Sequence, residues 1–160
     1  MKTYFRVTTT PGHEKRVAED LEDYLFRWDS EININDPHIG GVLIGYSKLP
    51  KDVLRGILTN VCIRHLHSIV IFDIFEKIHT FIQLYDILYK LLEEVVNKRQ
   101  KMCILVKFRG VDASTRKKML LLIKFLTNSF SFATLCTKKY VENINTILIE
   151  IIREYVGIKC

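Results

Sequence analysis

The pattern of apolar and polar residues predicts a strand and then a helix at the start of the chain. Residues 4–10 alternate between apolar and polar side chains, which is typical of a half-buried strand. Thr10-Pro11 then favours a helix start, because a hydroxyl can cap the helix and proline fits its first turn. Apolar residues at helical spacing continue to about Trp28. The expected buried stripe is Val17, Ala18, Leu21, Tyr24, Leu25 and Trp28.

The same kind of pattern predicts four more elements in the first half. They are a short strand at 32–35 ended by Asp36-Pro37, a strand at 40–46, a helix opened by Pro50 and a strongly apolar strand at 68–75. The resulting order is that of a ferredoxin-like β-α-β-β-α-β unit. We therefore expect an α+β protein whose first domain spans residues 1–76.

The second half, residues 77–160, continues the alternation of helices and strands with longer helices. The predicted elements are a helix from Thr80 to about Lys98, a strand at 103–109, a helix at 114–130, a strand candidate at 132–137 and a last strand at 145–152. The apolar residues of the first helix cover more than one face, so we expect this helix to be buried on several sides.

The stretch Cys103–Lys118 links the strand to the helix of this half. Period two places Ile104, Val106 and Phe108 on one face of the strand and Lys107 and Arg109 on the other. Gly110 then breaks the strand, since glycine tolerates backbone angles that other residues avoid. Either Asp112 or Ser114 can cap the helix that follows.

This helix opens with three cations in a row, Arg116, Lys117 and Lys118. Cations are mildly unfavourable at a helix N-terminus, by about 0.3–1 kcal/mol each when exposed. Free backbone N–H groups at the same place favour phosphate. The pattern therefore predicts that an anion, the backbone of a nucleic acid, binds among these side chains.

The distribution of charge supports this interpretation. The chain has 160 residues and a formal net charge of +6. Residues 1–76 carry a net charge of −2, whereas residues 77–160 carry +8. A basic second half favours a polyanionic partner, although a solvated basic surface remains an alternative.

Several other classes of site are disfavoured. The chain has four cysteines, Cys62, Cys103, Cys136 and Cys160. They are too far apart for a zinc knuckle, and a reducing location favours thiols over disulfides.

Cys62, His65 and His67 lack a fourth metal ligand, and Arg64 and His65 fit the carbonyl end of the preceding helix. Gly40-Gly41 indicates a turn rather than a phosphate loop. We expect no metal, no cofactor and no catalytic residue.

The sequence also bears on location. No apolar run reaches the roughly 18 residues that a membrane-spanning helix needs. Arg6 and the threonines that follow it interrupt any signal-like core near the start. We therefore expect a cytoplasmic protein that does not bind a membrane.

At this point the second half resembles a THUMP domain, an RNA-binding module of RNA-modifying enzymes. The residues that carry the resemblance are Lys107-Phe108-Arg109-Gly110 and the closing stretch Asn145–Ile158. The first half is similar to the ferredoxin-like domain that precedes THUMP, through Thr8–Glu14 (TTTPGHE) and Gly41–Ile44 (GVLI). The resemblance implies a THUMP-type α/β unit with a mixed sheet at residues 77–160.

The chain is most similar to stand-alone THUMP proteins that assist a tRNA acetyltransferase in making N4-acetylcytidine. The resemblance implies a non-catalytic protein that captures tRNA and presents it to a separate modifying enzyme. Eight cations are the predicted phosphate contacts: Lys107, Arg109, Arg116, Lys117, Lys118, Lys124, Lys138 and Lys139.

Alternatives stay open for these residues and for the chain. Arg109 can make a bidentate phosphate contact, or it can pair with an internal acid such as Glu150. The run Arg116–Lys118 can be a solvated face. For the whole chain, the alternatives are a protein-interaction subunit without direct RNA contact and a small transferase, although no activated nucleophile or paired carboxylate site is evident.

Overall fold

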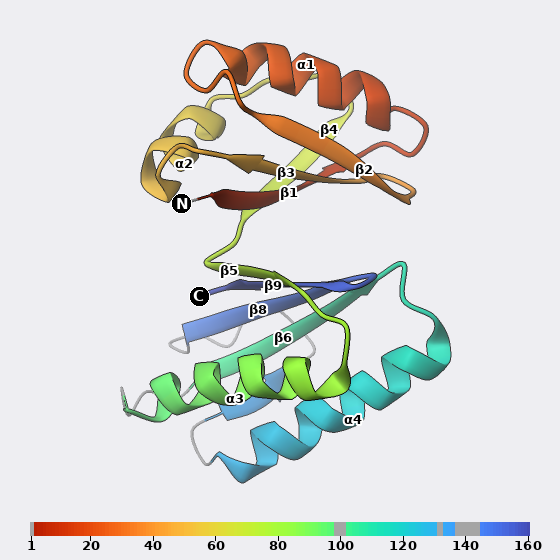
Figure 1. The fold of residues 1–160 in the computed structure, drawn as a ribbon, viewed down its shortest axis with the longest axis vertical. Coiled ribbons are helices and arrows are strands. Elements are labelled where there is room, and N and C mark those ends of the chain that lie inside the picture. Colours follow the sequence, from red (N-terminus) through yellow and green to blue (C-terminus); the bar gives the residue numbers. More distant parts are fainter. Residues whose placement is uncertain (1, 98–101, 131–132, 137–144) are drawn as a thin grey trace. The chain divides into compact units, whose positions relative to one another are not determined.

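The chain folds into two compact units, Met1–Asp73 and Ile74–Cys160, each with its own sheet and its own core. Figure 1 draws both units. The structure, a computed structural model, describes residues 2–97, 102–130, 133–136 and 145–160.

The first unit confirms the ferredoxin-like order of elements. They are β1 (Thr3–Thr9), α1 (Glu14–Phe26), β2 (Asn33–Ile39), β3 (Val42–Ser47), α2 (Lys51–Thr59) and β4 (Leu66–Ile71). The strands form one antiparallel sheet in the order β2-β3-β1-β4. Both helices cover the same face of this sheet (Figure 1). The loops that connect strands to helices therefore lie at the ends of the sheet.

The core of the first unit lies between the sheet and its two helices. Phe5 and Val7 of β1 are fully buried together with Leu21 of α1 and Leu54 of α2. Gly45 of β3 lies opposite Phe5 in the register, and a Cβ at this position would overlap the Phe5 ring. Glycine at this position therefore makes room for the largest side chain of the core.

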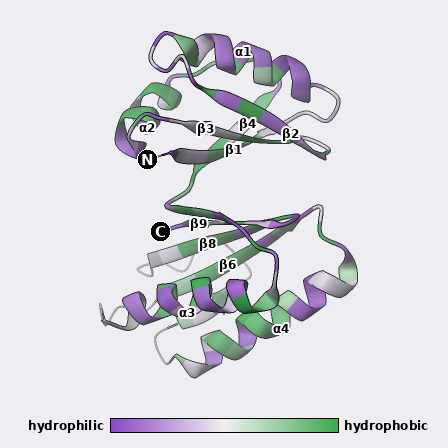
Figure 2. Cartoon of the chain, viewed as in Figure 1, coloured by the Kyte–Doolittle hydropathy of each residue, from purple (hydrophilic) through white to green (hydrophobic). Residues whose placement is uncertain are grey.

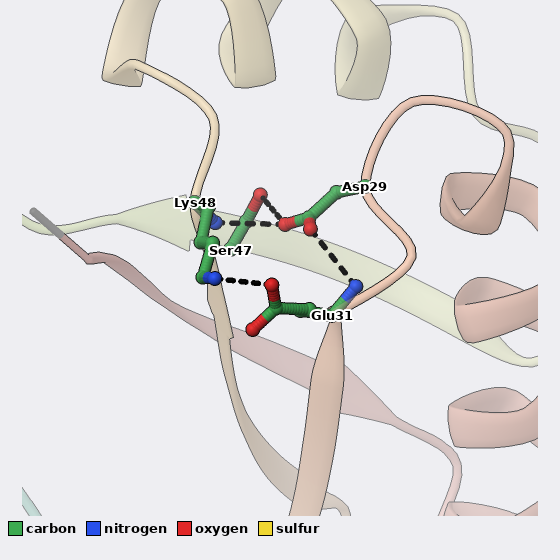
Figure 3. A network of polar contacts seen from close by, with 4 residues as sticks. All are labelled: Asp29, Glu31, Ser47 and Lys48. Atoms are coloured by element: carbon green, nitrogen blue, oxygen red, sulfur yellow. Dashed lines mark hydrogen bonds and ion pairs between the residues drawn. The ribbon is translucent and has the colours of Figure 1, made fainter.

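A buried carboxylate ties the end of α1 to the end of β3. Asp29 Oδ2 accepts hydrogen bonds from Ser47 Oγ (2.6 Å) and the Lys48 N–H (2.7 Å), and Oδ1 accepts one from the Glu31 N–H (3.0 Å; Figure 3). Burial acts to raise the pKa of Asp29, but these donors outweigh it and hold the pKa below its ordinary value. The ionised carboxylate therefore stabilises this corner of the unit.

The second strand is longer than the sequence predicted. Asp36-Pro37 was expected to end it, but β2 continues to Ile39 with a register shift after Asn35. Because β2 is an edge strand, a proline without an N–H is tolerated there.

The helix α1 is shorter than predicted at both ends. It begins at Glu14 rather than beside Thr10 and ends at Phe26. The expected apolar stripe is confirmed at Val17, Leu21 and Leu25, which are buried, but Trp28 is 42% exposed and contacts the Arg27 guanidinium. A tryptophan just beyond the last helical turn thus continues the apolar spacing without entering the core.

The apolar run 68–75 was predicted to form one strand but forms parts of two. β4 ends at Ile71, and Ile74–Lys77 forms β5, which pairs with β9 of the second sheet. Residues 74–76, which the sequence analysis assigned to the first domain, therefore belong to the second unit. Both strands are rich in apolar residues, so the hydrophobic pattern does not change where the chain passes from one sheet to the other.

The second unit is an α/β arrangement with the mixed sheet expected from the resemblance. Its elements are β5 (Ile74–Lys77), α3 (Phe81–Asn97), β6 (Met102–Arg109), α4 (Ala113–Ser129), β7 (Ala133–Cys136), β8 (Asn145–Ile152) and β9 (Tyr155–Lys159). The strand order is β5-β9-β8-β6-β7. β6 runs parallel to β7 and β8, and β9 runs antiparallel to β5 and β8.

The core of the second unit lies between this sheet and the two helices, which pack side by side on one face (Figure 1). Ile104, Ile149 and Ile158 from three strands are buried against Leu88 of α3 and Ile123 of α4. In Figure 2 hydrophobic residues follow one another along β6, whereas α3 alternates between hydrophobic and hydrophilic residues. This difference separates an inner strand from a helix with one solvated side. The expectation that α3 is buried on several sides is therefore wrong for its described residues, since Ile82 is 72% exposed.

The start of α3 confirms Thr80 as its cap. Thr80 Oγ1 accepts a hydrogen bond from the Gln83 N–H (3.2 Å), and Gln83 Oε1 accepts from the N–H groups of His79 (2.7 Å) and Thr80 (3.2 Å). This reciprocal arrangement is a capping box. It fixes the direction in which α3 leaves β5.

The chain ends in a hairpin that the sequence analysis missed. β8 ends at Ile152 and β9 begins at Tyr155, and these two residues pair directly. Arg153 adopts a positive φ of 52°, which turns the chain between them. Without a glycine or asparagine at the turn, the sequence gives no hairpin signal.

A disulfide corrects the expectation of free thiols. Cys103 of β6 and Cys136 of β7 are bonded, with their Cα atoms 5.7 Å apart. The parallel pairing of β6 with β7 brings together residues that are 33 positions apart in sequence, and cysteine spacing alone does not reveal this neighbourhood. Cys62 and Cys160 are exposed and lie outside the disulfide.

Candidate nucleic-acid interface

The connection from β6 to α4 has the strand–turn–helix form that the sequence predicted. Gly110 has a positive φ of 62° and follows the last residue of β6. Asp112, rather than Ser114, is the cap: its Oδ1 accepts a hydrogen bond from the Thr115 N–H at 2.9 Å. Hydrogen bonds from Thr115 lower the pKa of Asp112, so the ionised cap fixes the first turn of α4.

Four cations project from the exposed side of α4. Arg116 lies beside the sheet with its guanidinium carbon 5.4 Å from the centre of the Phe108 ring, which orients it while leaving it exposed. Lys117, Lys118 and Lys124 are exposed too, and the first turn of α4 contains no acidic residue. None of the four makes an ion pair with any residue in the part of the chain that the structure describes. We call Arg116, Lys117, Lys118 and Lys124 the basic α4 surface.

Two large apolar side chains lie on the same side of α4. Leu121 is 59% exposed and Phe125 is 66% exposed. They are four residues apart, so they are neighbours on the helix surface, and Lys117 precedes Leu121 by the same interval. They were not predicted to be exposed, because residues 119–123 (MLLLI) form a continuous apolar run in which the helical period is hidden.

Arg109 is bound to an internal acid, which is one of the two alternatives that the sequence left open. Its Nη2 lies 3.7 Å from Glu150 Oε1, with the Arg109 side chain 27% exposed and Glu150 fully buried. Glu150 is on β8, next to β6, where it is in register with Lys107. A buried carboxylate needs a compensating cation, so Arg109 has a structural partner that the α4 cations lack.

Lys107 lies apart from the basic α4 surface. It is exposed, and alternation along β6 places it on the sheet face opposite Ile104, Val106 and Phe108, which pack toward α3 and α4. The structure therefore places four of the eight predicted cations on exposed positions of α4, and Lys107 and Arg109 on the other face of the sheet. Lys138 and Lys139 lie outside the described residues. Contact of all eight with RNA stays a prediction.

The residues considered as metal ligands have other neighbours. The His65 ring stacks on the His13 ring, and His67 Nε2 lies 3.0 Å from Thr10 Oγ1. Among the described residues, no three His, Cys, Asp or Glu side chains are placed to hold a metal ion. Gly41 has a positive φ of 74° in the turn between β2 and β3, in line with turn chemistry.

Comparison with known proteins shows the fold but not a family. No family model and no curated protein matches the sequence. The chain is similar in structure to TrmN from Thermus thermophilus, with a TM-score of 0.54 and 12% identity over 98% of this chain and 45% of that one. It is also similar to PH1313 from Pyrococcus horikoshii Ot3, with a TM-score of 0.57 and 13% identity over 98% of this chain and 54% of that one.

A third similar structure is a 4-thiouridine synthetase in a complex with RNA and bound ATP. Its TM-score is 0.56 at 11% identity, over 99% of this chain and 41% of that one. Both units of the chain thus recur together in longer proteins, and the chain spans about half the length of those it matches. Among the described helices, none combines the length and the apolar character needed to cross a membrane.

Proposed function

We propose that this chain is a non-catalytic RNA-binding protein of the THUMP type that captures tRNA. The observation that carries the proposal is the basic α4 surface, whose four cations have no acidic partner in the described residues. The structural similarity supports it, because a protein of the same fold is described in complex with RNA.

In this proposal the α4 cations contact phosphates rather than base edges. Lysine and arginine contacts of this kind position a helix but carry no sequence information, and RNA duplexes are recognised mainly by shape, phosphates and 2′-hydroxyls. The ionised Asp112 cap holds the first turn of α4, so Arg116, Lys117 and Lys118 meet the ligand from a rigid helix. Lys107, which lies on the other face of the sheet, and Lys138 and Lys139 are further phosphate contacts in our proposal.

The finer role follows from the resemblance to stand-alone THUMP proteins. We propose that a separate cytoplasmic enzyme, a tRNA acetyltransferase that makes N4-acetylcytidine, acts on the tRNA that this chain holds. We assign no catalytic step to the residues described.

A second candidate function is assembly with a protein partner, and one observation favours it. Leu121 and Phe125 are 59% and 66% exposed between lysines of α4, and exposed apolar side chains often mark protein contacts. If the partner is held through protein alone, it survives RNase treatment of the complex. If RNA bridges the two proteins, RNase releases the partner.

The experiment that tests RNA binding is a salt titration of tRNA affinity. The slope of log affinity against log salt is expected to be about −0.7 to −0.9 per phosphate contact, so several contacts give a steep fall. The variant with Arg116, Lys117 and Lys118 replaced by Glu should lose most of the affinity and most of the slope. A matched control replaces three exposed lysines elsewhere, Lys2, Lys90 and Lys159, by Glu. A flat salt curve, or equal losses in both variants, contradicts the proposal.

A further inference from the structure

Cationic side chains gather at one end of the first unit, where the loop from β1 to α1 meets the connection from α2 to β4. The Thr10 N–H donates to the His65 carbonyl (3.0 Å), and Thr10 Oγ1 lies 3.0 Å from His67 Nε2. The His13 ring stacks on the His65 ring with centroids 3.7 Å apart and an interplanar angle of 9°. We define the histidine site as His13, Arg16, Arg64, His65 and His67.

Two acids, Glu14 and Asp20, lie near the histidine site. Glu14 Oε1 accepts a hydrogen bond from the Gly41 N–H (2.6 Å), which is the largest cause that lowers the pKa of Glu14. Asp20 Oδ2 lies 3.8 Å from Arg16 Nε, with both side chains well exposed to solvent. Arg64 is exposed and makes no ion pair with the residues that the structure describes. Cations therefore outnumber the acids that face this site.

His65 is held in an uncommon conformation within this cluster. Its φ is +69°, in the left-handed region that residues other than glycine seldom adopt. Burial, followed by the positive charges of His13, Arg64, Arg16 and His67, lowers the pKa of His65. Backbone strain of this kind recurs at ligand sites, and an anion among these groups would offset the repulsion between them.

A hollow adjoins the site along β4. It has a volume of about 280 Å³, and its lining combines four polar residues with five apolar ones: Arg55, Thr59, His67 and Ser68, and Leu58, Val61, Leu66, Ile69 and Ile71. Arg55 pairs with Asp52 at 3.2 Å on the exposed side of α2. The hollow gives space beside His67 for the group to which a phosphate is attached.

We propose that the histidine site binds a phosphate group, and that binding tightens as the pH falls. The inference goes beyond the proposed contact at α4, because it gives the first unit an anion site of its own. RNA is the source of phosphate that fits the proposed function, and a free phosphorylated ligand is the other source with the same chemistry. Arg16 and Arg64 supply positive charge, and histidine is the side chain whose charge changes with pH near neutrality.

The sign of the pH effect follows from the charges. In the free protein the lowered pKa of His65 means that protonation is disfavoured, so stability falls as the pH drops through the ordinary histidine value. A bound phosphate favours the protonated His65 ring, so the phosphate complex becomes more stable as the pH drops. Lys15 and Glu19, the neighbouring exposed pair at 3.8 Å, carry opposite charges and do not alter the sign.

The first experiment follows the histidine C2 protons by NMR during pH titrations with and without inorganic phosphate. The pKa of His65 should rise in phosphate, because the anion favours the protonated ring. A rise of one unit at one histidine corresponds to about a tenfold tighter complex at low pH than at high pH. His38 and His79, which lie outside the histidine site, serve as internal controls. Equal shifts at all histidines, or no shift at His65, overturn the proposal.

The second experiment uses tRNA affinity between about pH 6 and pH 8, the range in which histidine titrates. The wild type should bind more tightly at the lower pH, and the variant with His13→Gln and His65→Gln should lose this dependence. Arg64→Gln removes a positive charge but leaves the stack of His13 on His65 in place, and it should weaken tRNA binding at both pH values. This variant keeps the proposal testable if the double variant does not fold. His38→Gln is the matched control.

The two experiments separate the inference from the proposed function. If inorganic phosphate raises the pKa of His65 and tRNA affinity changes as stated, the phosphate site and the proposed function both stand and RNA is the source. If phosphate acts but tRNA affinity of the double variant and Arg64→Gln equals that of the wild type, the site holds a small phosphorylated ligand and the RNA source is rejected. If the wild type does not bind tRNA, the proposed function fails, while the NMR titration still decides the site.

Discussion

Arg109 and Arg116 lie at opposite ends of one short connection, yet their surroundings differ completely. Arg109 Nη2 is 3.7 Å from Glu150, which is fully buried, whereas Arg116 is exposed over the Phe108 ring in a turn that contains no acid. The sequence groups both into one basic motif. The comparison teaches that the neighbours of a cation, more than its type, decide whether it is available to a ligand.

The largest expected effect comes from breaking the internal pair. Arg109→Met leaves the Glu150 carboxylate buried without its cation. Urea unfolding should show that the free energy of unfolding falls by about 3 kcal/mol, which is at the lower end of the range for buried pairs because Arg109 is partly exposed. The double variant Arg109→Met, Glu150→Leu should recover most of this loss. If Arg109→Met is as stable as the wild type and reduces only tRNA affinity, Arg109 belongs with the α4 cations.

Asp29 in the first unit can be compared with Glu150, because it is also a buried carboxylate but is stabilised mainly by neutral hydrogen-bond donors. Asp29→Ala removes the acceptor of three hydrogen bonds and should lower the unfolding free energy by about 2 kcal/mol at neutral pH. The lowered pKa of Asp29 means that this contribution is present above its ordinary value of 3.8 and is lost as the pH falls below it.

The measurement is urea unfolding of both proteins at neutral pH and at about pH 3, where the difference between wild type and Asp29→Ala should shrink. Asp29→Asn, which keeps the shape but not the charge, should fall between them. A difference that stays constant with pH would show that the charge of Asp29 is not part of the stabilisation.

Lys124→Gln removes one charge from the basic α4 surface and so tests the exposed cations. Stability should stay unchanged, and the slope of log tRNA affinity against log salt should become shallower by about 0.7–0.9, the value of one phosphate contact. Lys90→Gln on the exposed side of α3 is the matched control and should leave the slope unchanged. Equal slopes for both variants would remove Lys124 from the basic α4 surface.

The smallest effect is expected at the cap. Asp112→Ala removes the acceptor of the Thr115 N–H, so the melting temperature should fall slightly and tRNA affinity should weaken through a less ordered first turn. Because the pKa of Asp112 is lowered, its contribution is present above the ordinary value of 3.8 and is lost as the pH falls below it. Asp112→Asn, which still caps, should keep the affinity; a loss as large as that of Asp112→Ala would point to charge instead.

Some elements lie close to where the apolar pattern and the capping signals predicted them. β1 and β6 form at the predicted places, and Thr80 caps α3 as expected. The pattern failed where a buried run crosses from one sheet to another, as at Asp73, and where a turn lacks its usual residues, as at Arg153. Period alone contains neither kind of information.

The candidate site was predictable only in part. The run Arg116–Lys118 and its helix start are visible in the sequence, and Glu150 was recognised as a possible partner of Arg109. The pairing itself depends on β6 and β8 being parallel neighbours, as does the disulfide on β6 and β7. The stack of His13 on His65 joins residues from two distant loops, so no spacing rule reveals it.

Footprinting of lysines in the presence and absence of tRNA tests the central claim most directly. Each lysine is methylated under limiting conditions, and the extent of modification is measured by mass spectrometry. The account predicts that tRNA protects Lys117, Lys118 and Lys124, while Lys2 and Lys90 react equally with and without it. Equal reactivity of the α4 lysines in both states, under conditions where tRNA is bound, would contradict the account.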